Sequence, residues 1–328
     1  MRAAWYERQG PAQDVLVVGE METPEPGPGE VRVRLRTSGL NPGDIKKRAD
    51  AFGLGMAYPR VVPHSDGAGV IDAVGAGVPA VRLGERVWVY GAQSYRPFGT
   101  AAEYVVLPGA QAVRLPDAVD FASGACLGIP ARTAHAAVYA GGPVAGLSVL
   151  VAGGAGNVGR AAVVLAAWGG ATVIATVGGV PQGDLARSAG AAHVLDYRAA
   201  DVAARVRALS GDAGVARVVE VAFGPNLPLD AAVIAPHGTI AAYSSDADPE
   251  PRVPFWPLLF TNVTIRLVGS DDLSAAEERQ AVADIAACLE AGALQPHIAW
   301  RFPLGEIVAA HEAMEGSRAP GHIILDIA

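Results

Sequence analysis

A glycine-rich segment at residues 148–160 constrains what this chain can fold into more than any other part of its sequence. The segment starts as a short apolar run, continues as Gly154-x-Gly156-x-x-Gly159, and passes into a run of helix-forming residues that ends at Trp168. A strand, a glycine turn and a helix in this order form the context that a dinucleotide-binding site requires. The first glycine permits a tight turn, the second lets the backbone approach a pyrophosphate, and the third lets the helix pack closely on the sheet.

The start of the expected helix supplies groups that bind phosphate. Backbone N–H groups at a helix N-terminus have no acceptor within the helix and point at the ligand. We therefore expect Gly156, Asn157 and Val158 to contact the pyrophosphate through their backbones. The chain contains 40 glycines, so a chance match is the alternative. The strand and the helix on either side favour the nucleotide site over a plain glycine-rich turn.

Length and composition exclude several other classes of protein. A chain of 328 residues suggests about two domains, and a hydrophobic content of 51% with 18% charged residues is enough for a sizeable core. The formal net charge is −8 and no tract is rich in lysine, which argues against a nucleic-acid surface. Lys46 and Lys47 are the only lysines, and neither stands four residues after a tyrosine, so the Tyr-x-x-x-Lys pair of short-chain reductases is absent.

Cysteine usage and hydropathy indicate where the protein works. The two cysteines, Cys126 and Cys288, form no Cys-x-x-Cys pair, and the N-terminal sequence lacks the apolar core of a signal peptide. We therefore expect a cytoplasmic protein without a metal knuckle. Residues 161–183 carry no charge and are long enough to span a bilayer, but Gly169-Gly170 interrupts them. A buried helix followed by a buried parallel strand explains this run better.

The order of patterns along the chain predicts an α/β fold. Residues 1–120 carry mostly β patterns, and Glu30–Arg36 alternates strictly between apolar and polar residues. From Phe121 onward, strand and helix patterns alternate, which predicts a doubly wound parallel sheet with crossover helices. Further strands are expected at the C-terminal end, at 298–302 and 322–327, and we expect them to complete the first domain.

Several short motifs occur in a fixed order along nearly the whole chain. They are Gly39-Leu40-Asn41-Pro42-x-Asp44, Pro63-x-x-Asp66-x-x-Gly69, Gly84-Glu85-Arg86-Val87, Gly128-Ile129-Pro130-x-x-Thr133-Ala134, the glycine turn, Ala189-Gly190-Ala191-x-x-Val194-Leu195-Asp196-Tyr197, and Ser317-Arg318-x-x-Gly321-His322-Ile323-Ile324-Leu325. With these motifs the chain resembles the medium-chain dehydrogenase/reductase superfamily, in its zinc-free quinone oxidoreductase (zeta-crystallin-like) branch. Several motifs in order are far more specific than any one of them.

The resemblance implies a fold and an activity. It implies a Rossmann domain, expected at residues 122–261, and a β-rich GroES-like catalytic domain built from both chain ends, expected at residues 1–121 and 262–328. It also implies NADPH-dependent, zinc-independent reduction of quinones or activated (α,β-unsaturated) carbonyl compounds by hydride transfer, often in dimers. The alternatives are an alcohol or ketone reductase of the same fold and a non-catalytic NADPH-binding module, because a fold does not determine a function.

The end of the second Rossmann strand bears on the choice of cofactor. An NAD site places Asp or Glu there to hold the ribose 2′-OH. Here the place holds Thr176, Val177 and Gly178, and no acid stands there to repel a 2′-phosphate, which favours NADPH. The resemblance adds Tyr197, which matches a tyrosine that lines the 2′-phosphate pocket; a half-buried aromatic residue at a strand end is the alternative.

The expected phosphate pocket lacks one element. A basic residue that is common just after the second strand in the family is replaced here by Gln182. Arg187 and Arg198 are the candidates to substitute for it.

Ligands for a catalytic zinc are not recognisable. Zinc-dependent relatives carry a cysteine near Ser38-Gly39 and a Gly-His-Glu motif, and zinc needs three such ligands. Here the second place reads His64-Ser65-Asp66, with the histidine one position off. We expect no metal and interpret His64 as a pocket-wall or turn residue, although it stands where the family usually has glycine.

Candidate catalytic residues are expected in a loop at residues 41–46. Asn41 matches a family residue at the nicotinamide and the substrate, and Asp44 matches a residue that we interpret as a loop organiser rather than an acid. Lys46 stands where relatives often carry tyrosine. As a cation it would stabilise the anion that a reduced quinone forms; a solvated surface lysine is the alternative.

Further cofactor contacts are expected at five positions. Thr133 matches a threonine beside the nicotinamide, with a helix-start hydroxyl as the alternative. Phe223, Tyr243 and Ser244 lie at the ends of the fourth and fifth Rossmann strands, where a doubly wound sheet binds its ligand. Arg318 matches a terminal arginine near the cofactor phosphates, with a surface arginine as the alternative.

An apolar stretch suggests self-association. Residues 255–260 read Phe-Trp-Pro-Leu-Leu-Phe, which is unusually apolar for a loop. In relatives this region precedes an edge strand that pairs across a dimer. We therefore expect a homodimer formed through residues 255–269; a hydrophobic plug at a domain hinge is the alternative.

Overall fold

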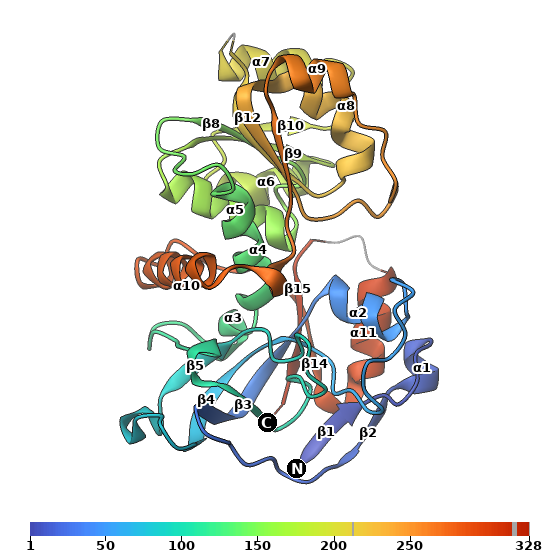
Figure 1. Cartoon of the computed structure of the whole chain (residues 1–328), viewed down its shortest axis with the longest axis vertical. Coiled ribbons are helices and arrows are strands. Elements are labelled where there is room, and N and C mark those ends of the chain that lie inside the picture. Colours follow the sequence, from blue (N-terminus) through green and yellow to red (C-terminus); the bar gives the residue numbers. More distant parts are fainter. Residues whose placement is uncertain (212, 317–319, 328) are drawn as a thin grey trace. The chain divides into compact units, whose positions relative to one another are not determined.

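The computed structural model describes residues 1–211, 213–316 and 320–327 (Figure 1). The chain forms two compact units, one from residues 1–130 and 295–328 and one from residues 131–294. The expected domain limits, at 121/122 and 261/262, differ from these divisions. At the second limit the cause is β13 (Thr264–Leu267), which pairs in parallel with β12 (Ile234–Ala242) and so extends the Rossmann sheet.

The unit of residues 131–294 is built on a six-stranded parallel sheet in the order β10-β9-β8-β11-β12-β13. The central strand β8 comes first in the chain and the order reverses on its two sides, which is the doubly wound arrangement predicted from the sequence. Besides β12 and β13, the strands are β8 (Ser148–Val151), β9 (Thr172–Val177), β10 (His193–Asp196) and β11 (Val215–Glu220).

Helices connect and cover the parallel strands. α5 packs beside α6, and α7 packs beside α8. The helices are α4 (Gly128–Val138), α5 (Asn157–Trp168), α6 (Val180–Ser188), α7 (Val202–Ser210), α8 (Phe223–Val233), α9 (Phe255–Phe260), the short η3 (Ser270–Asp272) and α10 (Ala275–Glu290). Leu150, Ile174, Val218 and Ile240, from four adjacent strands, share one buried apolar cluster. Such continuous burial explains why these strands read as apolar runs rather than as alternating ones.

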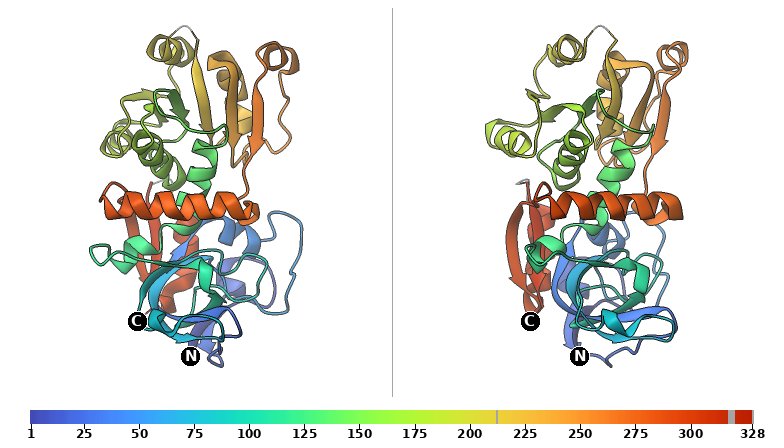
Figure 2. Two further views of the ribbon diagram at one scale, coloured as in Figure 1. Left: turned by 60° about the vertical axis from the view of Figure 1, so that its left-hand side comes forward. Right: turned by 90° about the vertical axis from the view of Figure 1, so that its left-hand side faces the viewer.

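The other unit is β-rich, and both ends of the chain build it. β15 (His322–Asp326) pairs antiparallel with β3 (Glu30–Leu40) and in parallel with β14 (Ile298–Pro303), so the last strand lies inside the sheet (Figure 2). This confirms the predicted β-rich domain formed by both chain ends. The sheet order is β14-β15-β3-β4-β5-β7, and β6 also pairs with β3.

This unit contains further strands and helices besides β3, β14 and β15. They are β1 (Arg2–Trp5), α1 (Ala12–Val15), β2 (Val17–Glu20), α2 (Pro42–Arg48), β4 (Asp66–Val74), η1 (Ala80–Arg82), β5 (Arg86–Val89), β6 (Tyr104–Pro108), η2 (Gly109–Gln111), β7 (Ala112–Arg114), α3 (Phe121–Gly124), η4 (Leu304–Glu306) and α11 (Ile307–Gly316). The alternation predicted at residues 30–36 is confirmed, because Val31, Val33 and Leu35 are wholly buried while their neighbours are not.

Two segments expected as loops are helices instead. α2 begins after Asn41, with Pro42 at its first position, and the Asp44 carboxylate accepts a hydrogen bond from the Asn41 N–H at 2.8 Å. Proline at that position and a carboxylate two residues later are a helix-start signal. In α9 the rings of Trp256 and Phe260 stack with centroids 5.9 Å apart, which is the contact that a spacing of four residues gives on a helix.

A buried carboxyl group lies in the parallel-sheet unit. Asp230, on α8, is wholly buried, and neither of its side-chain oxygens has a hydrogen-bond partner among the described residues. Burial raises the pKa of Asp230 well above its usual range, and the charge of the buried Glu220 raises it further. The raised pKa favours the protonated form of Asp230 in the folded protein.

We predict that Asp230→Asn stabilises the protein at neutral pH. The folded state binds a proton that the unfolded chain releases near pH 4, so the free energy of unfolding falls as the pH rises above that value toward the raised pKa. The substitution removes this loss and should increase the free energy of unfolding by roughly 1–3 kcal/mol at pH 7 and by much less at pH 4. Denaturant titrations at both pH values measure the difference.

Asp117→Asn is the matched control, because the Asp117 side chain is 88% exposed. It should change the free energy of unfolding little at either pH. A destabilised Asp230→Asn protein at pH 7 would contradict the raised pKa of Asp230.

Candidate active site

The glycine turn between β8 and α5 has the geometry of a phosphate-binding loop. The left-handed backbone lies at Gly153, with φ 64°, rather than at Gly154, to which the tight turn was assigned from the sequence. Gly154 is required for a different reason, because a Cβ there would lie 2.7 Å from the Cβ of Ala175. A Cβ at Gly159 would lie 2.2 Å from the carbonyl oxygen of Gly153, so the third glycine permits the close packing of helix and turn.

Gly156 differs from its neighbours. A Cβ on Gly156 would meet no protein atom closer than 3.4 Å, and its backbone, with φ −72°, suits any residue. Gly156 is exposed and directly precedes α5, whose first N–H groups, at Asn157 and Val158, lack intrahelical acceptors. The protein itself thus leaves the space above Gly156 open. An open cradle at the start of a twelve-residue helix fits a pyrophosphate.

A second corner of the same edge lies where β9 and β10 end. Thr176 is buried in β9 and its carbonyl oxygen accepts the Gly154 N–H at 3.0 Å. Gly178 follows β9, and a Cβ there would lie 3.4 Å from the ring of Tyr197, which follows β10 and is 53% exposed. Arg198 donates to the carbonyl oxygen of Gly178, and its guanidinium group lies 5.5 Å from the centroid of the Tyr197 ring.

The structure separates the two arginines that the sequence left as alternatives. Arg198 is bound at the corner formed by Gly178 and Tyr197, and it also pairs with Asp196 at 3.0 Å. Arg187 pairs with Asp184, three residues before it on α6, at 2.9 Å. Arg198 is therefore the arginine that the structure brings to the predicted 2′-phosphate corner.

The remaining cofactor candidates of this unit lie near the ends of β11 and β12 or in α4. Phe223 donates its N–H to the carbonyl oxygen of Ser244 at 3.1 Å, and Tyr243 donates its N–H to Glu220 at 3.0 Å. Because the strands are parallel, their carboxyl ends share the edge that holds the glycine turn. Thr133 is buried in the second turn of α4, so the helix-start alternative is wrong. Arg318 lies outside the described residues.

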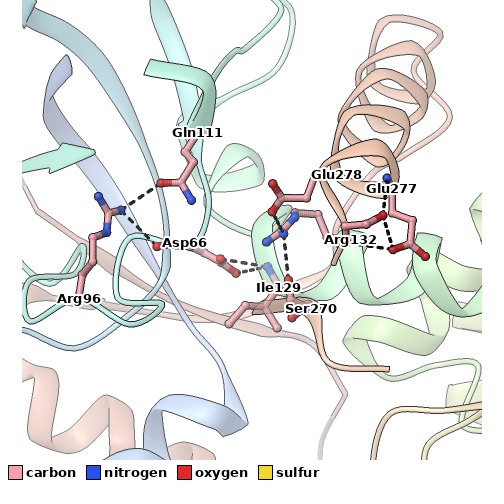
Figure 3. A network of polar contacts seen from close by, with 10 residues as sticks. Asp66, Arg96, Gln111, Ile129, Arg132, Ser270, Glu277 and Glu278 are labelled. Atoms are coloured by element: carbon pink, nitrogen blue, oxygen red, sulfur yellow. Dashed lines mark hydrogen bonds and ion pairs between the residues drawn. The ribbon is translucent and has the colours of Figure 1, made fainter. Parts of the chain in front are cut away.

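Asp66 organises the candidate catalytic residues of the β-rich unit. Its wholly buried carboxylate accepts a hydrogen bond from Asn41 Nδ2 at 2.8 Å. It also accepts the Ile129 N–H at 2.9 Å (Figure 3). A Cβ at Gly128 would lie 2.0 Å from an Asp66 oxygen, so the glycine permits this approach. The carboxylate of Asp44 accepts a hydrogen bond from the backbone N–H of Asn41. Asp44 therefore organises the helix start, and the Asn41 side chain is fixed by Asp66.

Lys46 lies in the last turn of α2. Its ammonium nitrogen is 5.9 Å from the centroid of the Phe52 ring, and the Phe52 side chain is 53% exposed. Lys46 is partly buried, and Lys47 beside it donates to Gln93 at 3.1 Å. The Lys46 ammonium group is thus a positive charge within cation–π distance of an exposed aromatic ring.

The hydrogen-bond partners of Asp66 and of His64 were not predicted from the sequence. Asp66 was visible only as part of a motif, and the contact to Asn41 joins residues 25 positions apart. His64 is wholly buried with φ 74°, and its ring bonds to Ser38 and His311. Burial lowers the pKa of His64 to about 3, so its ring is neutral.

No group of three or more His, Cys, Asp or Glu side chains that could hold a metal ion occurs in residues 1–211, 213–316 and 320–327. Polar side chains at α4 form a structural network instead. Arg132 donates to the carbonyl oxygen of Ser270 at 2.9 Å and pairs with Glu278 of α10 at 2.6 Å (Figure 3). His135 contacts Asp284, which also lies on α10, at 2.7 Å. These contacts join α10 to the parallel-sheet unit.

In the part of the chain that the structure describes, no helix combines the length and apolar character needed to cross a bilayer.

Comparison with known proteins supplies the family. A family model for the alcohol dehydrogenase GroES-like domain matches residues 27–117, and a model for zinc-binding dehydrogenases matches residues 189–325. A quinone oxidoreductase of Pseudomonas aeruginosa is 31% identical, with 95% of each chain covered. A 2-haloacrylate reductase of a Burkholderia species is 30% identical over 99% of this chain and 98% of its own length.

Solved structures agree over the full length of the chain. A structure described as an NAD-dependent alcohol dehydrogenase has a TM-score of 0.89 at 28% identity, with 100% of both chains covered. A mycobacterial protein solved in complex with NADPH has a TM-score of 0.86 at 27% identity, again with 100% of both chains covered. The chain therefore belongs to the quinone oxidoreductase-like group of the medium-chain dehydrogenase/reductase superfamily and is a medium-chain reductase.

Proposed function

We propose that this protein uses NADPH to reduce quinones or α,β-unsaturated carbonyl compounds by hydride transfer, without a catalytic metal. The observation that carries the cofactor assignment is the corner formed by Gly178, Tyr197 and Arg198. It has no carboxylate directly after β9 and holds an arginine bound to Gly178. The relative solved with NADPH supports the same assignment.

Residues of the chain have separate tasks in this proposal. NADPH supplies the hydride when it is bound. The backbones of Gly156, Asn157 and Val158 hold its pyrophosphate, because the space above Gly156 is open. Thr133, Phe223, Tyr243 and Ser244 remain proposed contacts along the cofactor, and Arg318 remains a proposed contact outside the described residues.

On the substrate side, Asn41 is proposed to face the substrate while Asp66 and Asp44 hold it. A quinone or an enone that accepts hydride becomes an oxyanion, which needs hydrogen-bond donors or a cation until a proton arrives. Lys46 is proposed to supply that cation. Metal independence is supported by the hydrogen bonds of the two side chains that could otherwise bind a metal. The Asp66 carboxylate accepts hydrogen bonds from Asn41 Nδ2 and the Ile129 N–H, and His64 is hydrogen-bonded to Ser38.

A ketone- or alcohol-converting reaction is the second candidate, because the chain is similar over its full length to the NAD-dependent alcohol dehydrogenase structure. A cytoplasmic location also remains a proposal, supported by the two unpaired buried cysteines, Cys126 and Cys288.

We predict that the purified protein oxidises NADPH faster than NADH in the presence of a simple para-quinone or an enone, and that a chelator leaves the rate unchanged. Loss of the reduced-nicotinamide absorbance measures both rates. Gly156→Val serves as the control without cofactor, because a side chain there would fill the open cradle while the backbone of Gly156 suits any residue. Turnover of ketones alone would favour the second candidate, and loss of turnover after chelation would overturn metal independence.

We predict that Arg198→Ala raises KM for NADPH by about tenfold and leaves KM for NADH unchanged, because a charge-assisted contact to the 2′-phosphate is lost. Arg187→Ala is the matched control and should change neither value. Gln182→Lys should lower KM for NADPH, because it adds a base just after the β9 corner. Steady-state kinetics with both cofactors test all three variants, and an equal effect of Arg198→Ala on both cofactors would refute the assignment.

We further propose that residues 255–269 form the interface of a homodimer. β13 pairs only with β12 in the described sheet, so its outer edge is open, and Leu267 on it is 74% exposed. Trp256 and Phe260 on α9 are 63% and 75% exposed. An open edge strand beside exposed large apolar side chains is a site at which sheets extend across two chains.

The protein should therefore sediment as a dimer at micromolar concentration, and Leu267→Arg should shift it toward the monomer. Val81→Arg is the control, since Val81 is 88% exposed but lies in η1 of the other unit. A wild-type monomer would exclude this interface.

A further inference from the structure

A chain of buried hydrogen bonds links two histidines to the backbone of Asp66. His64 Nε2 lies 3.0 Å from His311 Nε2, and His64 Nδ1 lies 2.8 Å from Ser38 Oγ. Ser38 Oγ lies 2.8 Å from Thr100 Oγ1, which donates to the carbonyl oxygen of Asp66 at 2.5 Å. All five residues are wholly buried, and all belong to the β-rich unit.

The direction of every bond in this chain follows from its last acceptor. A carbonyl oxygen accepts only, so Thr100 must donate its single hydroxyl proton to Asp66. Ser38 must then donate to Thr100, and its oxygen must accept a proton from His64 Nδ1. The ring of His64 is neutral because its pKa is lowered to about 3 by burial. Its Nε2 therefore carries a lone pair and accepts from His311 Nε2.

The directions of the hydrogen bonds therefore determine which ring nitrogen carries the proton in each histidine. His64 carries its proton on Nδ1 and His311 carries its proton on Nε2. Burial, with the neighbouring His64 and Arg48, lowers the pKa of His311 well below its usual value, so His311 is neutral too. Its Nδ1 is buried without a hydrogen-bond partner among the described residues. An unpaired buried acceptor is destabilising, and so is φ 74° at a residue with a side chain.

Both unfavourable features, the unpaired Nδ1 of His311 and the positive φ of His64, occur in the hydrogen-bond chain that ends at Asp66, the residue that holds the Asn41 side chain. The backbone carbonyl oxygen of Asp66 accepts a hydrogen bond from the Thr100 hydroxyl, and its carboxylate accepts one from the Asn41 amide. Asp66 therefore connects the hydrogen-bond chain of the two histidines to the amide that is proposed to face the substrate. We propose that His64 and His311 are positioning residues: their one-directional hydrogen-bond chain, through Ser38 and Thr100, holds Asp66 and thereby aims the Asn41 side chain at the substrate. This inference rests on the proposed function, because Asn41 faces the substrate only in that proposal.

Two matched pairs of substitutions separate positioning from mere support of the fold. His64→Asn and His64→Gly both tolerate φ 74°, but only asparagine places an N–H near the position of His64 Nδ1 and can still donate to Ser38. His311→Gln keeps a donor near the position of Nε2, and His311→Leu does not. Without that donor, His64 can move its proton to Nε2, and Ser38 must then turn its proton away from Thr100.

His64→Gly and His311→Leu should lower kcat by roughly tenfold to a hundredfold, as expected when a substrate-positioning group is displaced, without changing KM for NADPH. His64→Asn and His311→Gln should keep kcat within about twofold of the wild-type value. NMR of the imidazole nitrogens should find the Nδ1–H tautomer at His64 and the Nε2–H tautomer at His311 in the wild-type protein. The resonances of the Asn41 side-chain amide protons should shift in His64→Gly and stay in place in His64→Asn.

The two kinds of readout distinguish failure of this inference from failure of the proposed function. A wild-type protein without quinone or enone turnover, but with the expected tautomers and Asn41 resonances, would remove the proposed function and leave the hydrogen-bond chain standing. The opposite tautomers would overturn the inference, as would a His64→Gly protein with unchanged kcat and unchanged Asn41 resonances. Should His64→Gly fail to fold, the His311 pair and the wild-type tautomers decide the same question.

Discussion

The β-rich unit depends on one buried carboxylate, that of Asp66. A buried charge is tolerated only when hydrogen-bond donors replace the water that it has lost. Asp66 obtains them from Asn41, which begins α2, and from the backbone of Ile129, which lies at the start of α4. It also begins β4 in the main sheet. One side chain therefore fixes the start of a strand and of two helices, and the polar groups of the candidate substrate site are arranged around it.

The parallel-sheet unit obeys a different constraint, which is the close approach of backbone to backbone. The turn after β8 has room for neither a Cβ at Gly159 nor one at Gly154, because the Gly153 carbonyl oxygen and the Ala175 side chain fill those places. At Gly156 the protein leaves the space empty. Gly154 and Gly159 are thus required for the chain to pack, whereas Gly156 leaves space that a ligand can occupy. This contrast distinguishes a binding loop from a turn that is merely rich in glycine.

Much of the fold could be predicted because its signals are local. Apolar runs between turn residues indicated the parallel strands, and strict alternation indicated β3. The starts of α2 and α9 were missed even though Pro42 and the spacing of Trp256 and Phe260 carry short helical signals, because the surrounding composition resembles that of a loop. The division near residue 294 could not be read locally, since the edge strand β13 belongs with whichever strand it pairs.

The site was harder to predict than the fold because its contacts join distant residues. The choice between Arg187 and Arg198 depends on which carboxylate and which carbonyl oxygen each arginine reaches. The pairing of His64 with His311 spans 247 positions, and no sequence period or motif connects them. Such contacts follow from topology, which becomes known only once the strands are paired.

The position of the last strand has a consequence for biosynthesis. β15 lies between β14 and β3, so the β-rich sheet is incomplete until residues 322–326 are available. The residues of the other unit, 131–294, are contiguous and need nothing from the end of the chain to form their sheet. During synthesis the parallel-sheet unit can therefore fold on the ribosome while β3, made earlier, still lacks β15 beside its residues 37–40. Residues 37–40 of β3 therefore remain unpaired on that side until residues 322–326 have been synthesised.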